Sequence, residues 1–160
     1  MADEKDIKKA LRKLEYGIYV ITLGKGAEGN AFTASWVTQV SSEPPMVAAA
    51  VHNKHKSAWH LNDLQSYVIN ILPESGLPTA RAYYGPAESG YDKLKAKDIS
   101  AAPVSGTVRL NGAIGYLDCK IVDRVKTGNH TLFVAEVVDG ALQTDGPILS
   151  TTNGKLHYAG

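Results

Sequence analysis

Apolar and polar residues follow three patterns along this chain, and each pattern predicts a different kind of element. Between residues 3 and 15, apolar side chains recur at helical spacing among charged ones, which predicts an amphipathic helix capped by Asp3. After Gly17 the period changes to two, and the β-branched residues of 18–23 predict a strand. Residues 46–51 are a continuous apolar run, which predicts a buried strand, and residues 67–72 predict another.

The other elements are predicted from residue type and turn signals. They are strands over 32–41, 104–108, 113–122 and 131–138, a helix over 57–64 and a short helix before Gly85. Asn111-Gly112 and Asn153-Gly154 are hairpin-turn signals, and the second predicts that 149–151 pairs with 156–158. About seven strands without regular strand–helix alternation favour a mainly β fold, an antiparallel barrel, over a doubly wound parallel sheet.

Size and charge narrow the class of protein. A chain of 160 residues is expected to form a single domain over 1–160. Its 17 basic and 16 acidic residues produce no field that would attract nucleic acid or anionic lipid. The N-terminus is charged throughout, unlike a secretory signal, and no apolar run approaches the roughly 20 residues that cross a bilayer. We therefore expect a cytoplasmic protein that binds neither nucleic acid nor membrane.

The one cysteine, Cys119, cannot form an intramolecular disulfide, which fits a reducing compartment. We interpret it as a small apolar side chain on a strand rather than as a reactive thiol.

The stretch from Gly24 to Gly29 spells G-x-G-x-x-G directly after a predicted strand. Dinucleotide binding by that pattern requires a helix to begin there, because the pyrophosphate sits on the helix N-terminus. The residues immediately after Gly29 have the composition of a strand, so we interpret the glycines as a hairpin loop.

Hydroxyl side chains gather on the strand predicted over 32–41. Alternation places Thr33 and Ser35 on one face, opposite Ala34 and Trp36. A strand end with small side chains and free amides can hydrogen-bond the edge of a planar heterocycle. Trp36 then either walls the ring or fills the core.

The segment from His52 to Ser57 ends a buried strand and opens a helix. Lys54 and Lys56 supply cations, and Ser57 is placed to cap the helix, with free N–H groups beyond it. The segment is therefore either a phosphate site at a helix terminus or a capped helix behind a solvated basic loop.

Two other chemistries fit less well. The spacing of His52, His55 and His60 is not H-E-x-x-H and no carboxylate or cysteine pair accompanies it, so no metal site is expected. No G-x-S-x-G elbow supports a hydrolytic triad. His130, at a strand start, either donates to the electron-rich edge of a ligand or belongs to a surface turn.

Six segments between about Leu14 and Val138 together resemble the flavin reductase-like, FMN-binding split-barrel family, in the style of its flavoredoxin and high-molecular-weight-rubredoxin members. They are GIYVIT, TASWVTQVSSEPPMVAAAV, NKHKSAWHL, YVINIL, YYGPAESGYDKL and GNHTLFVAEV, in the family's order. The resemblance implies a homodimeric split β-barrel with FMN near the dimer interface. It implies electron transfer from NADH or NADPH through FMN to an acceptor, with a redox partner protein as one such acceptor.

The resemblance also assigns site residues by motif. The isoalloxazine would be lined by Thr33, Ala34, Ser35 and Trp36. The ribityl phosphate would lie near Asn53, Lys54 and Ser57, beside Lys56, and His130 would approach the flavin or the nicotinamide. A second segment near the site contains Tyr84, Gly85, Asp92 and Lys93.

The chain departs from the family pattern at two informative places. Asn129 stands where the family commonly has an aspartate, which changes the protonation expected of His130. Ser150-Thr151-Thr152 stands where an aromatic residue is common, which leaves the C-terminal wall of the site undefined. Two alternatives therefore stay open: an FMN electron-transfer protein that does not react with NAD(P)H, and a split barrel that binds another planar ligand such as haem.

Overall fold

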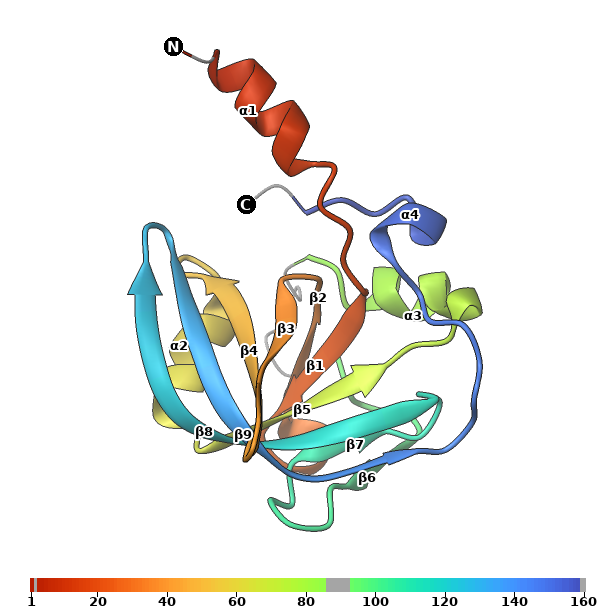
Figure 1. The fold of residues 1–160 in the computed structure, drawn as a ribbon. Helices are drawn as coiled ribbons and strands as arrows, with labels where there is room; N and C mark the ends of the chain where they lie inside the picture. The colour runs from red at the N-terminus through yellow and green to blue at the C-terminus, as the bar shows by residue number, and fades with distance from the viewer. Residues whose placement is uncertain (2, 86–92, 159–160) are drawn as a thin grey trace.

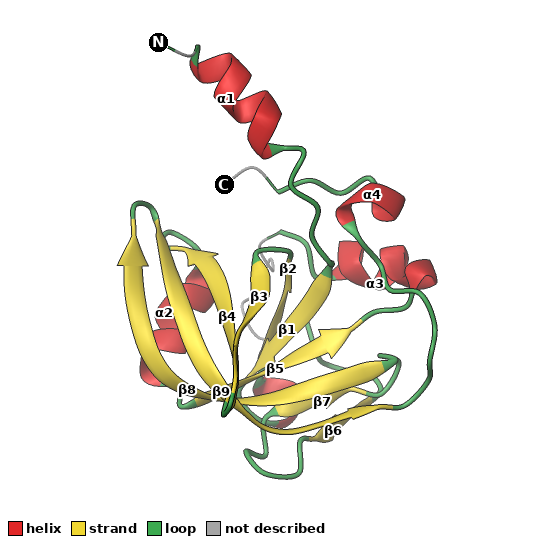
Figure 2. Cartoon of the chain, viewed as in Figure 1, coloured by secondary structure: helices red, strands yellow, loops and turns green. Residues whose placement is uncertain are grey.

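A seven-stranded antiparallel sheet, rolled into a split barrel, dominates the computed structural model, which describes residues 1, 3–85 and 93–158 (Figures 1 and 2). Its strand order is β2-β1-β5-β8-β9-β4-β3. The strands are β1 (Tyr19–Leu23), β2 (Asn30–Ala34), β3 (Val37–Ser42), β4 (Pro45–His52), β5 (Ser66–Ile71), β8 (Gly115–Thr127) and β9 (His130–Leu142). A separate pair joins β6 (Ile99–Ala101) to β7 (Val108–Leu110). The mainly β fold expected from the sequence is confirmed.

Short helices connect and flank the strands. They are α1 (Glu4–Leu11), α2 (Lys56–Asp63), α3 (Leu77–Ala82) and α4 (Thr151–Gly154), with 3-10 turns η1 (Gly26–Glu28) and η2 (Glu74–Gly76). α1 begins after Asp3, whose carboxylate accepts the Lys5 N–H as predicted. None of its residues is buried, and it stands away from the barrel in Figure 1. No helix in the described ranges is long and apolar enough to span a membrane.

Both faces of the central strands are buried, which explains their mostly apolar sequences. On β1, Ile21 and Leu23 join the core inside the barrel, whereas Val20 joins a second cluster outside it. The inner core also contains Tyr67, whose hydroxyl donates to the Phe133 carbonyl at 3.0 Å. The strand predicted at 18–23 and the buried strands predicted at 46–51 and 67–72 are confirmed.

The single strand predicted over 32–41 is wrong, because the chain turns at Ser35 and Trp36. β2 pairs with β1 and β3 pairs with β4, so two consecutive strands form opposite edges of the sheet. The Val37 N–H donates to the Ser35 carbonyl at 2.9 Å, and the Ala50 N–H donates to the Trp36 carbonyl at 2.9 Å. No glycine or proline marks this break in the sequence. The break is fixed instead by the pairing of β2 and β3 with two different strands. The turn brings both edges together at the slit of the barrel.

The strand predicted over 104–108 is also wrong. The N–H groups of Val104 and Ser105 donate to the buried Asp118 carboxylate at 3.3 and 2.9 Å, so this stretch is a turn. Strand β7 begins only at Val108. Asn111-Gly112 does form a turn, but β7 and β8 on either side of it do not pair with each other.

The hairpin predicted at Asn153-Gly154 is replaced by the helical turn α4. Ser150 and Asn153 form a reciprocal capping box there: the Ser150 hydroxyl accepts the Asn153 N–H, and the Asn153 side chain accepts the Ser150 N–H at 2.8 Å. Side-chain capping therefore overrides the Asn-Gly turn signal, and 149–151 does not pair with 156–158.

Two interpretations of single motifs are confirmed. Gly24 to Gly29 contains only the turn η1 and leads into β2, so the dinucleotide-binding pattern lacks its helix. Cys119 is buried on β8, and burial raises the pKa of its thiol to about 12. At that pKa the thiol is neutral and unreactive near neutral pH.

Candidate functional site

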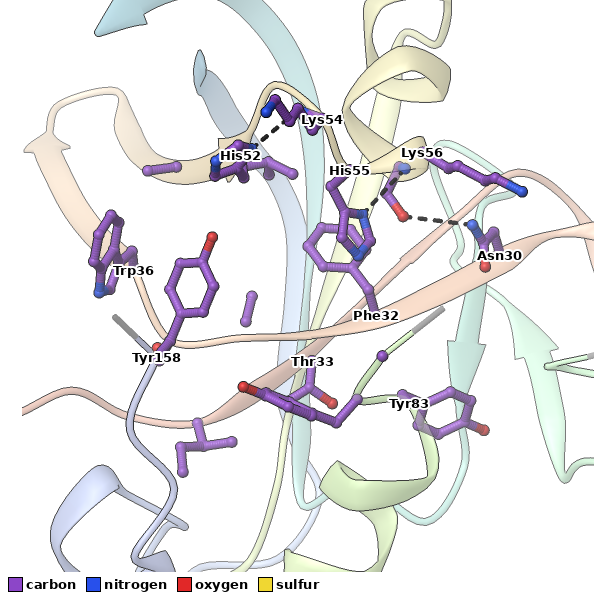
Figure 3. Close-up of a pocket in the computed structure, with 18 of the residues that line it drawn as sticks. Asn30, Phe32, Thr33, Trp36, His52, Lys54, His55, Lys56, Tyr83 and Tyr158 are labelled. Atoms are coloured by element: carbon purple, nitrogen blue, oxygen red, sulfur yellow. Dashed lines mark hydrogen bonds between the residues drawn. The ribbon is translucent and has the colours of Figure 1, made fainter. Parts of the chain in front are cut away.

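A pocket of about 590 Å³ opens where the two sheet edges meet (Figure 3). The turn between β2 and β3, the turn between β4 and α2, the end of α3 and the C-terminal segment all line it. Its volume lies within the roughly 300–1,000 Å³ typical of small-molecule sites. Its described lining contains Lys54, Lys56 and Lys93 but no aspartate or glutamate. The pocket is therefore suited to a ligand with an apolar body and negative charge.

One wall of the pocket is made by the turn between β2 and β3. Thr33, Ala34, Ser35 and Trp36 all line it, so the strict alternation expected of a continuous strand does not hold there. The Thr33 hydroxyl donates to the Ala80 carbonyl. The Ser35 hydroxyl, in contrast, is buried and has no hydrogen-bond partner among the described residues. Buried polar groups are nearly always paired, so the Ser35 hydroxyl is an exception in this wall that a ligand hydrogen bond would satisfy.

The predicted helix at 57–64 exists, but its cap is His55 rather than Ser57. His55 has an extended backbone, and its Nδ1 accepts the Ser57 N–H at 3.2 Å, so α2 begins at Lys56. Ser57 is instead buried in the first turn, where its hydroxyl accepts from Asn30 at 3.4 Å. The ring of His55 packs against Phe32 at 5.4 Å. The missed signal is that a histidine Nδ1 can cap a helix as a serine hydroxyl does.

Charge and burial both affect the imidazole of His55. Burial lowers its pKa, and the nearby Lys93 and His52 lower it further. The ring therefore stays neutral at neutral pH, as a hydrogen-bond acceptor must. Lys54 and Lys56 are exposed on either side of it and line the pocket, as Figure 3 shows.

Lys93 links residues 83–85, which follow α3, to β2. Its ammonium donates to the carbonyls of Ala31 at 3.0 Å, Gly85 at 2.9 Å and Tyr83 at 3.4 Å, and burial lowers its pKa. Tyr84 and Gly85 line the pocket as the resemblance implies. Asp92 lies outside the described residues.

His130 begins β9 as predicted, but it lies behind the pocket wall. Only 4% of its surface is exposed, and it is not among the residues that line the pocket. Its Nδ1 lies 2.6 Å from the Asn129 side-chain oxygen, and its Nε2 lies 3.0 Å from the Tyr158 hydroxyl. Burial lowers the pKa of His130, and the neighbouring His52 lowers it further. With an amide at position 129, nothing in this cluster favours the charged ring.

Tyr158 supplies an aromatic wall from the C-terminal segment. Its ring lies 5.0 Å from the ring of Trp36, and Trp36 lies 4.7 Å from His130. The wall that the sequence left undefined near residues 150–152 therefore comes from a position several residues later. Only the packing of the C-terminal segment could place Tyr158 here, since one tyrosine near a chain end carries no spacing signal.

In the turn between β4 and α2, His52 lines the pocket, whereas Asn53, which was expected near the ligand, does not. The Asn53 side chain accepts from the Thr131 hydroxyl at 2.7 Å, and the residue is not among those that line the pocket. It joins the turn to β9. His52 does line the pocket, although the sequence assigned it no ligand role. The described residues contain no group of three or more His, Cys, Asp or Glu side chains that could hold a metal ion.

Comparison with known sequences gives one family and several relatives. The profile of the Flavin reductase like domain matches residues 11–160. The reductase component of 4-nitrophenol 4-monooxygenase/4-nitrocatechol 2-monooxygenase from Rhodococcus opacus is 28% identical over 91% of this chain and 76% of its own length. High molecular weight rubredoxin from Moorella thermoacetica is 28% identical over 86% of this chain and 61% of its own length.

Other relatives are much longer proteins. Diflavin flavoprotein A 1 from Synechocystis is 29% identical over 86% of this chain, which covers 24% of that protein. The chain thus spans about a quarter of the length of the diflavin flavoproteins that it matches.

Solved structures share the fold over nearly the whole chain. The NADH:FAD oxidoreductase SgcE6 from Streptomyces globisporus C-1027 superposes with a TM-score of 0.86 at 25% identity, covering 96% of this chain and 93% of its own. Flavin reductase PheA2 superposes with a TM-score of 0.80 at 26% identity, covering 98% of this chain and 97% of its own.

Proposed function

Because this chain belongs to the Flavin reductase like domain family, we propose that it binds FMN and passes electrons from NADH or NADPH through the flavin to an acceptor. The observation that carries the proposal is the unpartnered Ser35 hydroxyl in a pocket whose described lining has lysines but no carboxylate. FMN, when bound, supplies the redox chemistry. The protein binds it, orients it and keeps water from it.

The described residues that line the pocket form two ends, and these suit the two ends of FMN. At one end, Ser35 and the aromatic rings of Trp36 and Tyr158 suit a planar heterocycle. At the other end, Lys54 and Lys56 at the start of α2 suit a phosphate. Ser57 and Lys93 support this end from within, and Asn53 supports it by fixing the turn.

The choice of electron donor rests on similarity. SgcE6 is named as an NADH:FAD oxidoreductase, and it has been solved in complex with NAD and FAD fragments. We propose a nicotinamide donor for this chain on that basis. FMN is proposed over FAD because the resemblance of the sequence motifs is to the FMN-binding members of the family.

We also propose a cytoplasmic homodimer that binds neither nucleic acid nor membrane. The apolar face of α1 supports a partner chain, because Ile7 and Leu11 are 48% and 55% exposed in the single chain. The near balance of charge supports the proposal that the protein binds neither nucleic acid nor membrane. The single buried thiol supports a reducing compartment such as the cytoplasm. Size-exclusion chromatography with light scattering tests the dimer, and a monomer at micromolar concentration would contradict it.

A second candidate function is electron transfer through bound FMN without direct reaction with NAD(P)H. The longer relatives favour it, since in diflavin flavoproteins the matching region is only about a quarter of the protein. In that case a redox partner protein, not a nicotinamide, would reduce the flavin.

The test is the visible spectrum of the purified protein, with added FMN if needed, before and after anaerobic NADH or NADPH. Reduction faster than that of free FMN supports the oxidoreductase. A bound flavin untouched by both nucleotides selects the electron carrier. If the protein binds neither FMN nor FAD, both the oxidoreductase and the electron-carrier proposals are contradicted. A Soret band on adding haem would then favour a split barrel that binds haem.

A matched pair of variants tests the pocket itself. Removing the unpartnered hydroxyl with Ser35→Ala is expected to weaken FMN binding about 3- to 10-fold, the value of one hydrogen bond. Thr38→Ala changes an exposed residue on the neighbouring strand β3 and is expected to leave binding unchanged. Equal affinity of the two variants would place the ligand elsewhere.

A further inference from the structure

Two histidines stand one behind the other at the aromatic end of the pocket. The rings of His52 and His130 lie 4.9 Å apart in an edge-to-face arrangement. His52 lines the pocket, whereas His130 is covered and is not among the lining residues. Figure 3 shows His52 between Lys54 on one side and the rings of Trp36 and Tyr158 on the other, apart from Lys56. Of these two imidazoles, only that of His52 is therefore within reach of a ligand in the pocket.

A backbone hydrogen bond fixes the proton of His52. Its Nδ1 accepts the Lys54 N–H at 3.0 Å, so this nitrogen cannot carry a proton. In the neutral ring the proton must then be on Nε2. No described residue accepts a hydrogen bond from that nitrogen, so the turn that begins α2 leaves His52 with an N–H donor beside the pocket.

His130 has the opposite arrangement. The Asn129 oxygen at 2.6 Å can only accept, which places the His130 proton on Nδ1. Nε2 then accepts from the Tyr158 hydroxyl at 3.0 Å. Both nitrogens are occupied by the protein, so His130 cannot donate to a ligand unless the Tyr158 contact breaks.

We infer that His52, rather than His130, donates the imidazole hydrogen bond to the ligand, to an acceptor atom on the electron-rich edge of the flavin ring. This inference rests on the proposed function. Its ring packs against His130, whose ring also packs against Trp36, and this link to the aromatic end favours the ring edge over the phosphate. In this arrangement His130 is a positioning residue: it packs against the His52 and Trp36 rings from outside the pocket and is held by the Tyr158 hydroxyl.

Two amide substitutions separate the ligand role from a purely structural one. The side-chain amide of glutamine reaches about as far as Nε2, so His52→Gln keeps a donor for the ligand but loses the acceptor for Lys54 N–H. The amide of asparagine lies near the position of Nδ1, so His52→Asn keeps that acceptor and loses the ligand donor. The measurements are dissociation constants for riboflavin and FMN by fluorescence quenching, and the midpoint potential of the bound flavin.

The inference predicts that His52→Gln binds both flavins within about 2-fold of the wild type, whereas His52→Asn binds both about 3- to 10-fold more weakly. It also predicts a changed midpoint potential in His52→Asn, because a donor at the ring edge interacts differently with oxidised and reduced flavin. The opposite order, or equal behaviour of the two variants, overturns it. A loss seen with FMN but not with riboflavin also overturns it, because that result places His52 at the phosphate.

Two controls keep the outcomes distinct. His157→Gln changes an exposed histidine outside the pocket lining and is expected to match the wild type. Thermal unfolding of each variant shows whether the α2 turn still folds. A wild-type protein that binds neither FMN nor FAD contradicts the proposed function itself, whereas wild-type binding with unaffected His52→Asn contradicts only the assignment of His52.

Discussion

The hydroxyl of Tyr158 lies 3.0 Å from Nε2 of His130, which joins the C-terminal segment to the start of β9. Tyr158 packs at the same time against Trp36 at the turn between β2 and β3. Three segments far apart in the sequence therefore meet through one tyrosine. The contact closes one end of the pocket and satisfies a ring nitrogen that would otherwise be buried without a partner.

Removing that hydroxyl is expected to destabilise the protein. Tyr158→Phe keeps the ring packing on Trp36 but leaves His130 Nε2 without its donor, which costs about 1 kcal/mol of unfolding free energy. Urea denaturation measures the change. Tyr84→Phe is the matched control, because Tyr84 is 51% exposed and is expected to change stability by less than about 0.5 kcal/mol. Equal effects of both variants would contradict a role for the Tyr158 hydroxyl.

Much of the β architecture could be predicted from residue type because it depends on local signals. The strands β1, β4 and β5 are rich in apolar and β-branched residues and lie between turn residues, and Asp3 precedes its helix as an ordinary cap. The break at Ser35 and Trp36 could not be predicted, because it exists only when β2 and β3 pair with different strands. Local propensity there favours one unbroken strand.

The candidate site shows the same contrast between features that local sequence predicts and features that only the folded chain determines. Thr33–Trp36, Lys54, Lys56 and Lys93 could be proposed from motifs, since each motif is continuous in sequence. His52 and Tyr158 could not, because their roles depend on which nitrogen a backbone amide occupies and on where the last residues pack. The role expected of His130 depended on its exposure, and exposure is a property of the folded chain.

The free energy of unfolding is expected to decrease as the pH is lowered from neutral into the acidic range. His55 and His130 both have pKa values lowered by burial, whereas in the unfolded chain a histidine titrates near about 6.5. Between the folded and unfolded values the unfolded state binds more protons, so the free energy of unfolding decreases as pH falls through this window. Above about pH 6.5 both states are neutral and the contribution is fully present.

The variant that checks this pH dependence is His55→Asn. Asparagine is a good helix cap but does not titrate, so the cap survives acid while one of the two histidine contributions disappears. Urea midpoints measured from about pH 8 to about pH 5 are expected to fall less steeply in the variant than in the wild type. An unchanged slope would mean that His55 does not sense the folded environment.

A buried amide is expected to hold β7 against the main sheet. Asn70 on β5 donates to the Val20 carbonyl at 3.0 Å and to the Thr22 hydroxyl at 2.9 Å, and it accepts the Leu110 N–H at 2.8 Å. Asn70→Ala leaves these buried groups without partners, which costs about 2–4 kcal/mol. Chemical denaturation checks the value, and Asn62→Ala on the exposed face of α2 should change it by about 0.5 kcal/mol or less.

The two exposed lysines at the start of α2 are expected to discriminate between flavins. FMN and riboflavin differ only in the phosphate, and Lys54 and Lys56 line the pocket without a nearby described carboxylate. The double substitution Lys54→Gln, Lys56→Gln is therefore expected to weaken FMN binding about 10-fold and riboflavin binding by less than about 2-fold. The wild-type preference for FMN should also decrease with added salt, because exposed charges are screened.

Lys95→Gln, Lys97→Gln is the matched control for these lysines, since it removes the same net charge from exposed positions that do not line the pocket. If the effect were one of overall charge, both double variants would weaken FMN binding equally. If the phosphate lies at the start of α2, only the first pair lowers the ratio of FMN to riboflavin affinity. Equal loss of both flavins in Lys54→Gln, Lys56→Gln would instead place these lysines beside the ring system.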